Sequence, residues 1–286
     1  ASSGRASYTE TEKGITVKAN GRTFVFSKKD GQLKDVSVNN RKISFANGPR
    51  FIGARRADRS LDQFYNHDDE KAKAKDRTYS EFTDAAVFTK LDVKEEGGNL
   101  ILTANYKLGN LDKAQWTIHP DGMATLDYTY NFSGVVDLMG ICFDYPEEQV
   151  LSKRWLGAGP YRVWQNRIHG TQYDIWENDY NDPIPGETFT YPEFKGYFGS
   201  VSWMSIRTKE GTISLTNETP DSYIGVYQPR DGRDRLLYTL PESGISVLNV
   251  IPPVRNKVNS TDLCGPSSQP KWVDGSQTGR LVIRFE

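Results

Sequence analysis

The sequence predicts an all-β fold, a large antiparallel β-sandwich, and three observations lead to this prediction. Short runs of residues alternate between apolar and polar side chains with a period of two, which is typical of half-buried strands. Turn signals such as Asn20-Gly21 and Asp121-Gly122 separate these runs at short intervals. No stretch shows the spacing of a strong amphipathic helix. Many short strands spread over the whole chain favour a sandwich.

The N-terminal part of the chain is predicted to form a β-meander. Residues 1–13 are polar and rich in serine, so we expect a flexible N-terminal segment there, followed by a single sandwich domain over residues 14–286. The highly charged stretch between Asp58 and Glu81 is expected to be a solvated insert. Strands are predicted at residues 15–19, 23–26, 33–38 and 42–45.

The middle of the chain carries the clearest alternation. Between residues 124 and 132, Leu126, Tyr128, Tyr130 and Phe132 share one face, and polar residues occupy the other, as in a half-buried antiparallel strand. Residues 251–272 are rich in proline, serine and asparagine and are expected to be a long excursion without regular structure. Further strands are predicted at residues 100–106, 115–119, 201–206, 211–215, 244–250 and 281–285.

Composition and charge restrict the partners of this protein. The 36 Lys and Arg residues nearly balance the 37 Asp and Glu residues, which gives a net charge of -1 and makes nucleic acid or an anionic membrane an unsuitable partner. No apolar run has the length of a membrane span. The compartment stays open, with a periplasmic or secreted protein favoured over a cytoplasmic one. Cys142 and Cys264 either pair or stay reduced and buried.

Residues 155–181, called the aromatic segment below, form the strongest candidate for a binding site in the sequence. The segment contains three tryptophans and three tyrosines together with several amide side chains. Gly157, Gly159 and Pro160 lie so close together that we expect a long ordered loop across a sheet and not a regular strand.

Such a loop suits carbohydrate, because the C–H faces of sugars stack on aromatic rings and their hydroxyls bind planar amides and carboxylates. The alternative is an aromatic cluster that packs the loop onto its own core. The candidate carbohydrate-binding residues are Trp155, Tyr161, Arg162, Trp164, Asn166, His169, Trp176 and Glu193.

The search for catalytic motifs gives no defined active site. Glycoside cleavage needs two carboxylates on opposite sides of the bond, and Glu177, Asp179, Glu187 and Glu193 are the acidic residues near the aromatic segment. The sequence alone does not place any two of them across a bond. We expect no cofactor; calcium held by loop carboxylates and carbonyls is compatible with such a sandwich, but no set of ligands singles itself out.

Three stretches resemble a known family. Gly48-Pro49-Arg50, followed by Arg56-Ala57-Asp58, is similar to the "GPRPNFWRAPTDND" stretch of the C-terminal sandwich domain of glycoside hydrolase family 2 β-galactosidases. Residues 155–161 (WLGAGPY) resemble the "WFGRGPHENY" stretch of that domain, and residues 203–206 (WMSI) resemble its "VRWLALR" strand. The resemblance extends from about Gly14 to Phe285 and implies a supersandwich of the galactose-mutarotase-like type.

The resemblance also implies a division of labour. In that family the two catalytic glutamates lie on a separate TIM barrel upstream of the sandwich, and no strand–helix repeat of that kind is present here. We therefore expect a non-catalytic portion of a larger glycoside hydrolase, with carbohydrate and the catalytic barrel of the same enzyme as partners. Leu263 or Cys264 stands where well-known members carry a pocket tryptophan, so the resemblance does not imply galactose specificity.

Two alternatives remain. The first is a stand-alone aldose 1-epimerase, which needs an acid and a base on either side of the sugar ring; His169 is the only histidine in the aromatic segment. The second is a free carbohydrate-binding module, which an upstream barrel in the intact gene would exclude.

Overall fold

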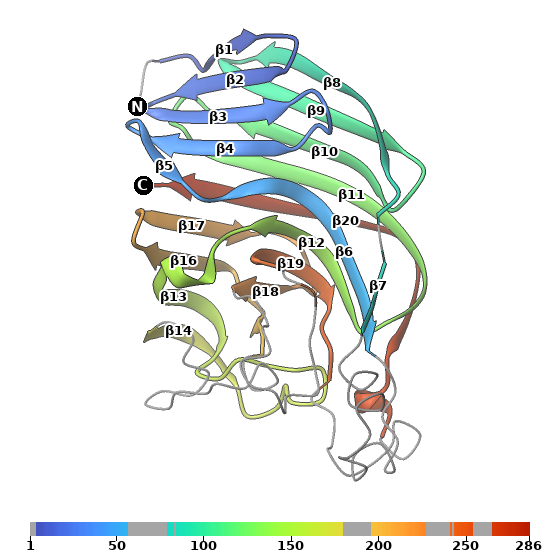
Figure 1. Cartoon of the computed structure of the whole chain (residues 1–286). Helices are drawn as coiled ribbons and strands as arrows, with labels where there is room; N and C mark the ends of the chain where they lie inside the picture. The colour runs from blue at the N-terminus through green and yellow to red at the C-terminus, as the bar shows by residue number, and fades with distance from the viewer. Residues whose placement is uncertain are drawn as a thin grey trace, which may run out of the picture.

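The computed structural model describes residues 4–56, 79–82, 84–179, 196–226, 241, 243–253 and 265–286 (Figure 1). Over these ranges the backbone forms two sheets of antiparallel strands and two short 3₁₀ turns, and it contains no α-helix. The predicted all-β sandwich is thereby confirmed. Most of the charged insert predicted between Asp58 and Glu81 lies outside the described residues.

The first sheet joins eleven described strands. Their order is β1-β2-β3-β4-β6-β12-β19-β18-β15, with β5 beside β4 and β7 beside β6. The bounds are β1 Ser7–Glu10, β2 Gly14–Ala19, β3 Arg22–Ser27, β4 Leu33–Val38, β5 Arg41–Ile43, β6 Ala46–Arg56, β7 Tyr79–Glu81, β12 Leu138–Asp144, β15 Phe198–Gly199, β18 Tyr223–Val226 and β19 Ile245–Val250.

The second sheet joins nine described strands in the order β14-β13-β16-β17-β20-β11-β10-β9-β8. Its two longest strands, β11 and β20, lie side by side near its centre (Figure 1). The bounds are β8 Val87–Glu96, β9 Asn99–Lys107, β10 Leu111–Ile118, β11 Ala124–Val136, β13 Val150–Gly159, β14 Gln172–Asp179, β16 Trp203–Thr208, β17 Thr212–Asn217 and β20 Lys271–Phe285.

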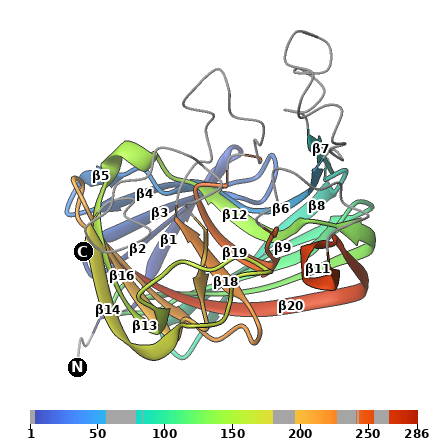
Figure 2. The same ribbon diagram turned by 90° about the horizontal axis from the view of Figure 1, so that it is seen from below.

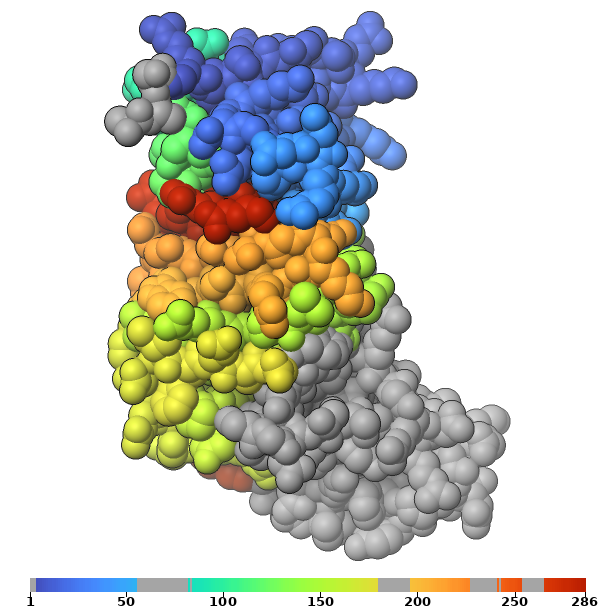
Figure 3. All heavy atoms as spheres, turned by 90° about the vertical axis from the view of Figure 1, so that its left-hand side faces the viewer, coloured from blue at the N-terminus to red at the C-terminus, as the bar shows by residue number. Residues whose placement is uncertain are grey.

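The main core lies between the two sheets, which Figure 2 shows as stacked layers with β20 along the lower side. Aromatic rings from opposite sheets meet there: Phe26 of β3 packs edge-on against Trp116 of β10 at 5.9 Å between ring centroids. Phe51 of β6 likewise lies 5.4 Å from Tyr130 of β11. Strand ends of both sheets form the face seen in Figure 3, from β1–β5 in blue to β13 and β14 in yellow-green.

A second, smaller cluster covers part of the other face of the eleven-stranded sheet. Ile52 of β6, Cys142 of β12 and Leu248 of β19 point away from the main core, and Trp164 and Tyr197 pack on them from outside the sheet. In this region the eleven-stranded sheet therefore buries side chains on both faces, because the main core covers one face and the segment around Trp164 and Tyr197 covers the other.

Two boundaries differ from those that the sequence predicts. Strand β1 lies inside residues 1–13, where the sequence predicts a flexible segment. The sequence does not indicate this strand because all four of its residues are exposed and form no apolar pattern. Strand β20 begins at Lys271, well before the predicted residue 281. There the exposed Trp272 lies on the outer face with polar residues, and Gly275 and Gly279 lie on the inner face, so the usual alternation of apolar and polar residues is missing.

Candidate functional site

The aromatic segment begins with a hairpin and not with a loop. Residues 155–159 belong to β13, and β14 pairs with it antiparallel, so that Trp155 lies opposite Trp176. The prediction that glycines exclude a strand here was wrong, for a reason of packing. A Cβ on Gly159 would lie 2.6 Å from Nε1 of Trp176, and one on Gly157 would lie 3.0 Å from backbone atoms at residues 199–201. Both glycines therefore allow other groups to approach β13 closely.

Residues 160–171 form the connection from β13 to β14, and this part does lie across a sheet. Trp164 is only 3% exposed and meets the ring of Tyr197 edge-on, with centroids 5.5 Å apart. Val163 exchanges two backbone hydrogen bonds with Tyr197, at 2.7 and 2.8 Å. The connection is thus held on the outer face of the eleven-stranded sheet by its own aromatic side chain.

Amide side chains tie the same connection to the segment before β20. Nε2 of Gln165 donates to the carbonyl oxygens of Ser267 and Gln269 at 3.0 and 2.8 Å. Nδ2 of Asn166 donates to the hydroxyl of Ser268 at 2.9 Å. These planar amides, which the sequence suggests as sugar ligands, are used within the chain in this structure.

Two buried cations flank one aromatic ring where the edges of the two sheets meet. Nζ of Lys153 lies 6.0 Å and Cζ of Arg162 lies 5.7 Å from the ring centroid of Phe198, and Trp155 packs edge-on against the same ring at 4.8 Å. Lys153 also donates to the carbonyl oxygen of Asp179 at 3.0 Å. Burying cations costs free energy unless they are paired, and the ring face and this carbonyl supply part of the compensation.

The eight candidate residues do not form one concave surface. Trp155 and Arg162 meet at Phe198 in the interior, whereas Trp164 and Asn166 lie at the outer face of the eleven-stranded sheet. Tyr161 is 43% exposed, His169 is exposed and Trp176 is half-buried. Glu193 and Glu187 lie outside the described residues, as does Cys264, so the pairing of the two cysteines stays open.

The structure also brings forward residues that the sequence did not single out. Tyr173 of β14 is 58% exposed, and its hydroxyl makes a 2.6 Å hydrogen bond with that of Ser202. Lys153 and Phe198 become important only because the ring of Phe198 contacts both Lys153 and Arg162. No local signal announces them, because a lone lysine and a lone phenylalanine in a strand are ordinary residues.

The Gly48-Pro49-Arg50 motif has a structural role on β6. A Cβ on Gly48 would lie 2.7 Å from the carbonyl oxygen of Cys142 and would also strike the ring of Phe143, so only glycine allows this approach. The guanidinium of Arg50 binds the carboxylate of Asp144 at 2.8 Å. Burial acts to lower the pKa of Arg50, and nearby Cys142 and Asp144 outweigh it, so that the pKa is raised. The motif fastens β6 to β12.

Over the described part of the chain, no three His, Cys, Asp or Glu side chains come together in a way that would hold a metal ion. None of the described segments is a helix that is long and apolar enough to cross a bilayer.

The architecture defines a large antiparallel sandwich of the galactose-mutarotase-like type. The chain belongs to the β-galactosidase small chain family, whose model matches residues 18–249. No curated protein matches the chain in a sequence search.

Two solved structures are similar over almost the whole chain. Galactose 1-epimerase from Lactobacillus acidophilus NCFM is similar over 99% of both chains, with 10% sequence identity and a TM-score of 0.50. A galactose mutarotase-like protein from Lactobacillus casei is similar over 98% of this chain and 100% of its own, with 10% identity and a TM-score of 0.42. At such identities the likeness concerns the fold alone.

Proposed function

We propose that the chain is a non-catalytic sandwich domain of a β-galactosidase-like glycoside hydrolase, which cleaves O-glycosidic bonds through a TIM barrel elsewhere in the enzyme. The observation that carries this proposal is the match of residues 18–249 to the β-galactosidase small chain family. The role proposed for the domain is to pack on the catalytic part and to contribute to carbohydrate contact at the border between them.

The exposed members of the candidate set are the ones suited to such contact. Tyr161 and His169 are exposed to solvent. Trp176, which follows them in the sequence on β14, is half-exposed. Trp155 and Trp164 would act from beneath, by holding β13 and the connection in place. This separates residues that touch sugar from residues that support them.

The proposal is tested by comparing the chain alone with the intact enzyme on a nitrophenyl β-galactoside. The chain alone is expected to release no nitrophenol, and Tyr161→Ala in the intact enzyme is expected to raise KM several-fold with little change in kcat, as for a lost binding contact. Tyr8→Ala, an exposed tyrosine on β1, is the matched control and should leave KM unchanged. Hydrolysis by the chain alone would refute the proposal.

The aldose 1-epimerase alternative is tested with the same preparation of the chain alone. Polarimetry of freshly dissolved α-galactose measures mutarotation by the chain alone, and the proposal expects only the spontaneous rate. A clear acceleration that disappears in His169→Ala would establish an epimerase instead, since an acid–base group would then act on the anomeric centre.

Trp164→Ala serves as a different kind of variant. Because Trp164 is almost wholly buried between the connection and the sheet, its removal leaves a cavity and is expected to cost about 3–5 kcal/mol of unfolding free energy. A loss of sugar response in this variant alone therefore reports a displaced connection, and Tyr161→Ala is needed to identify direct contact.

A further inference from the structure

The outer face of the nine-stranded sheet carries a continuous polar strip along β11 and β20. The two strands pair over thirteen positions, from Ala124↔Ile283 to Val136↔Lys271, without a register shift. Because side chains alternate between faces, the residues that face outward form cross-strand pairs in one unbroken row. These pairs are Asp127–Arg280, Thr129–Thr278, Asn131–Ser276, Ser133–Asp274 and Val135–Trp272.

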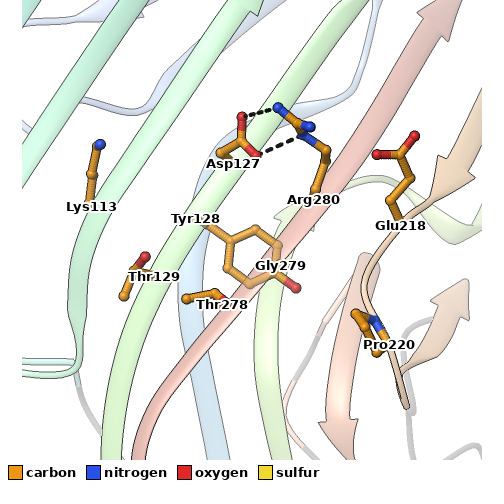
Figure 4. A pocket seen from close by; sticks show the side chains of 9 residues that line it. All are labelled: Lys113, Asp127, Tyr128, Thr129, Glu218, Pro220, Thr278, Gly279 and Arg280. Atoms are coloured by element: carbon orange, nitrogen blue, oxygen red, sulfur yellow. Dashed lines mark hydrogen bonds and ion pairs between the residues drawn. The ribbon is translucent and has the colours of Figure 1, made fainter.

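At one end of this strip lies a hollow that is lined by charged and hydroxyl-bearing side chains (Figure 4). Its volume is about 400 Å³, which is within the usual size range of small-ligand sites. The carboxylate of Asp127 fixes the guanidinium of Arg280 through two contacts of 2.8 and 3.1 Å. The side chains around the hollow include Lys113, Asp127, Thr129, Glu218, Thr278 and Arg280.

The other end of the strip carries an exposed aromatic ring. Trp272 is 69% exposed, more than any other tryptophan in the chain. It lies eight residues from Arg280 on β20, and at the rise of an extended strand this corresponds to roughly 27 Å along the sheet. A monosaccharide would cover only a part of this length, whereas an extended chain of sugars would reach from the hollow to the indole.

We propose that this strip binds an extended neutral oligosaccharide, with one sugar unit in the hollow and a distant unit stacked on Trp272. The short hydroxyl and amide side chains between the two ends are suited to donate to and accept from sugar hydroxyls. An indole face suits the C–H face of a pyranose ring, because it combines a large apolar surface with few rotatable bonds.

The charges of the strip select a neutral ligand. Asp127 is paired with Arg280, Lys113 and Glu218 carry opposite charges beside the same hollow, and Asp274 lies opposite the uncharged Ser133, so no strong field of either sign attracts a polyanion or a polycation. A protein partner fits less well, since serine and threonine seldom supply the main binding energy of protein interfaces.

This site goes beyond the proposed role of the domain, because it lies on a different sheet from the connection at residues 160–171. The connection packs on the outer face of the eleven-stranded sheet, and the strip lies on the outer face of the nine-stranded sheet. Oligosaccharide binding to the strip therefore does not depend on contact between the domain and a catalytic barrel, and each can fail without the other.

The test uses acrylamide quenching of tryptophan fluorescence and calorimetry on the whole chain. The probes are neutral β-linked galacto-, xylo-, gluco- and manno-oligosaccharides, each from the monosaccharide to the hexasaccharide. At least one series is expected to bind with affinity that rises with chain length and to protect Trp272, the most exposed indole, from acrylamide. Failure of every series to bind would overturn the proposal.

Three variants locate the binding. Trp272→Ala removes the stacking face and Thr278→Arg fills the hollow, and each is expected to weaken binding of the longest oligosaccharide about tenfold or more. Both positions are exposed, so the fold should persist, which circular dichroism and the unfolding midpoint will check. Tyr8→Ala on the other sheet is the control and should bind like the wild type. Binding that neither strip variant weakens would place the site elsewhere and refute the proposal.

Discussion

At the scale of single residues, the carboxylate of Glu210 connects the two sheets through three hydrogen bonds. It lies in the turn between β16 and β17 and accepts hydrogen bonds from the amide and hydroxyl of Ser44, at 2.9 and 2.5 Å. It also accepts one from the hydroxyl of Tyr145 at 3.1 Å. This single side chain therefore links a hairpin of the nine-stranded sheet to the end of β5 in the other sheet.

Glu210→Ala is expected to destabilise the protein by about 2–3 kcal/mol, because hydrogen bonds to a charged group contribute more than neutral ones and the partners lose their acceptor. Urea unfolding followed by circular dichroism measures this change. Glu12→Ala, at an exposed carboxylate between β1 and β2, is the control and should change the free energy by less than about 0.5 kcal/mol. Equal effects of the two substitutions would contradict the proposed link.

The sequence alone did not show which individual residues of the candidate site are buried and which are exposed. The burial of Trp164 depends on Ile52 and Leu248, which come from strands far away in the chain. The sequence shows that tryptophans gather in residues 155–181, but it does not show which of them a distant strand will cover. The two possibilities of sugar contact and core packing could therefore be stated but not separated before the fold was known.

At the scale of elements, the pairing of β12 with β19 depends on a missing side chain. The register shifts between Met139 and Gly140. A Cβ on Gly140 would lie 2.7 Å from the Cα of Leu248 and would also strike the carbonyl of Val247. Because both obstacles are backbone atoms of the neighbouring strand, they cannot move without separating the two strands.

Gly140→Ala is therefore expected to cost about 3 kcal/mol or to prevent folding, as overpacking in a well-filled interior does. Thermal and urea unfolding measure the loss. Gly265→Ala is the matched substitution, since a Cβ there meets nothing within 4 Å; its effect should stay within about 0.5 kcal/mol. A Gly140→Ala protein as stable as the wild type would show that β12 and β19 are not packed as described.

Strand β8, an edge of the nine-stranded sheet, is protected by charge. Lys90 pairs with Asp92 at 2.8 Å and Lys94 with Glu96 at 3.3 Å along its exposed face. Charged residues on an edge strand discourage pairing with the edge of another molecule. Because these pairs are well exposed, their contribution to stability is small.

Replacing Lys90 and Lys94 together by valine is expected to promote aggregation, visible in light scattering, while the free energy of unfolding changes by less than about 1 kcal/mol. Lys18→Val with Lys113→Val is the control, because these exposed lysines lie on β2 and β10 and have a paired strand on both sides. If both double variants aggregate to the same extent, net charge and not edge protection is the cause.

The sequence predicted the strands of the main core better than the hairpin of β13 and β14 at the edge of its sheet. The alternation of Leu126, Tyr128, Tyr130 and Phe132 is confirmed, and all four are buried in β11. The turn at Asn20-Gly21 is also confirmed, with positive φ at both residues. The hairpin of β13 and β14 was missed because its glycines serve a contact with Trp176, and such a contact has no signature in local sequence.

At the scale of the whole molecule, buried tyrosines make stability depend on alkaline pH. Burial is the largest cause that raises the pKa of Tyr106, Tyr128, Tyr130 and Tyr145. For Tyr128 the pKa rises to about 12, although the hydroxyl of Thr219 opposes the shift. A raised folded-state pKa contributes stability that is complete below the unfolded-state pKa and is lost as the pH rises towards the folded-state pKa.

The free energy of unfolding is therefore expected to fall between about pH 10 and about pH 12, because the unfolded chain releases phenolic protons that the folded chain keeps. Tyr128→Phe should reduce the slope by up to about 1.4 kcal/mol per pH unit, the value for one proton. Urea unfolding at a series of alkaline pH values, with phenolate absorbance as a second signal, measures it. A slope unchanged in Tyr128→Phe would show that this phenol titrates normally.

The place of β20 has a consequence for how the protein is made. This strand lies between β17 and β11 and so joins β14-β13-β16-β17 to β11-β10-β9-β8 within one sheet. On the ribosome, both half-sheets must wait with an open edge until residues 271–285 have emerged from the exit tunnel. Contacts so distant in sequence form slowly, and open edges attract other chains. The nascent protein is therefore most exposed to misassembly just before its synthesis reaches β20, the stage at which a chaperone would be most useful.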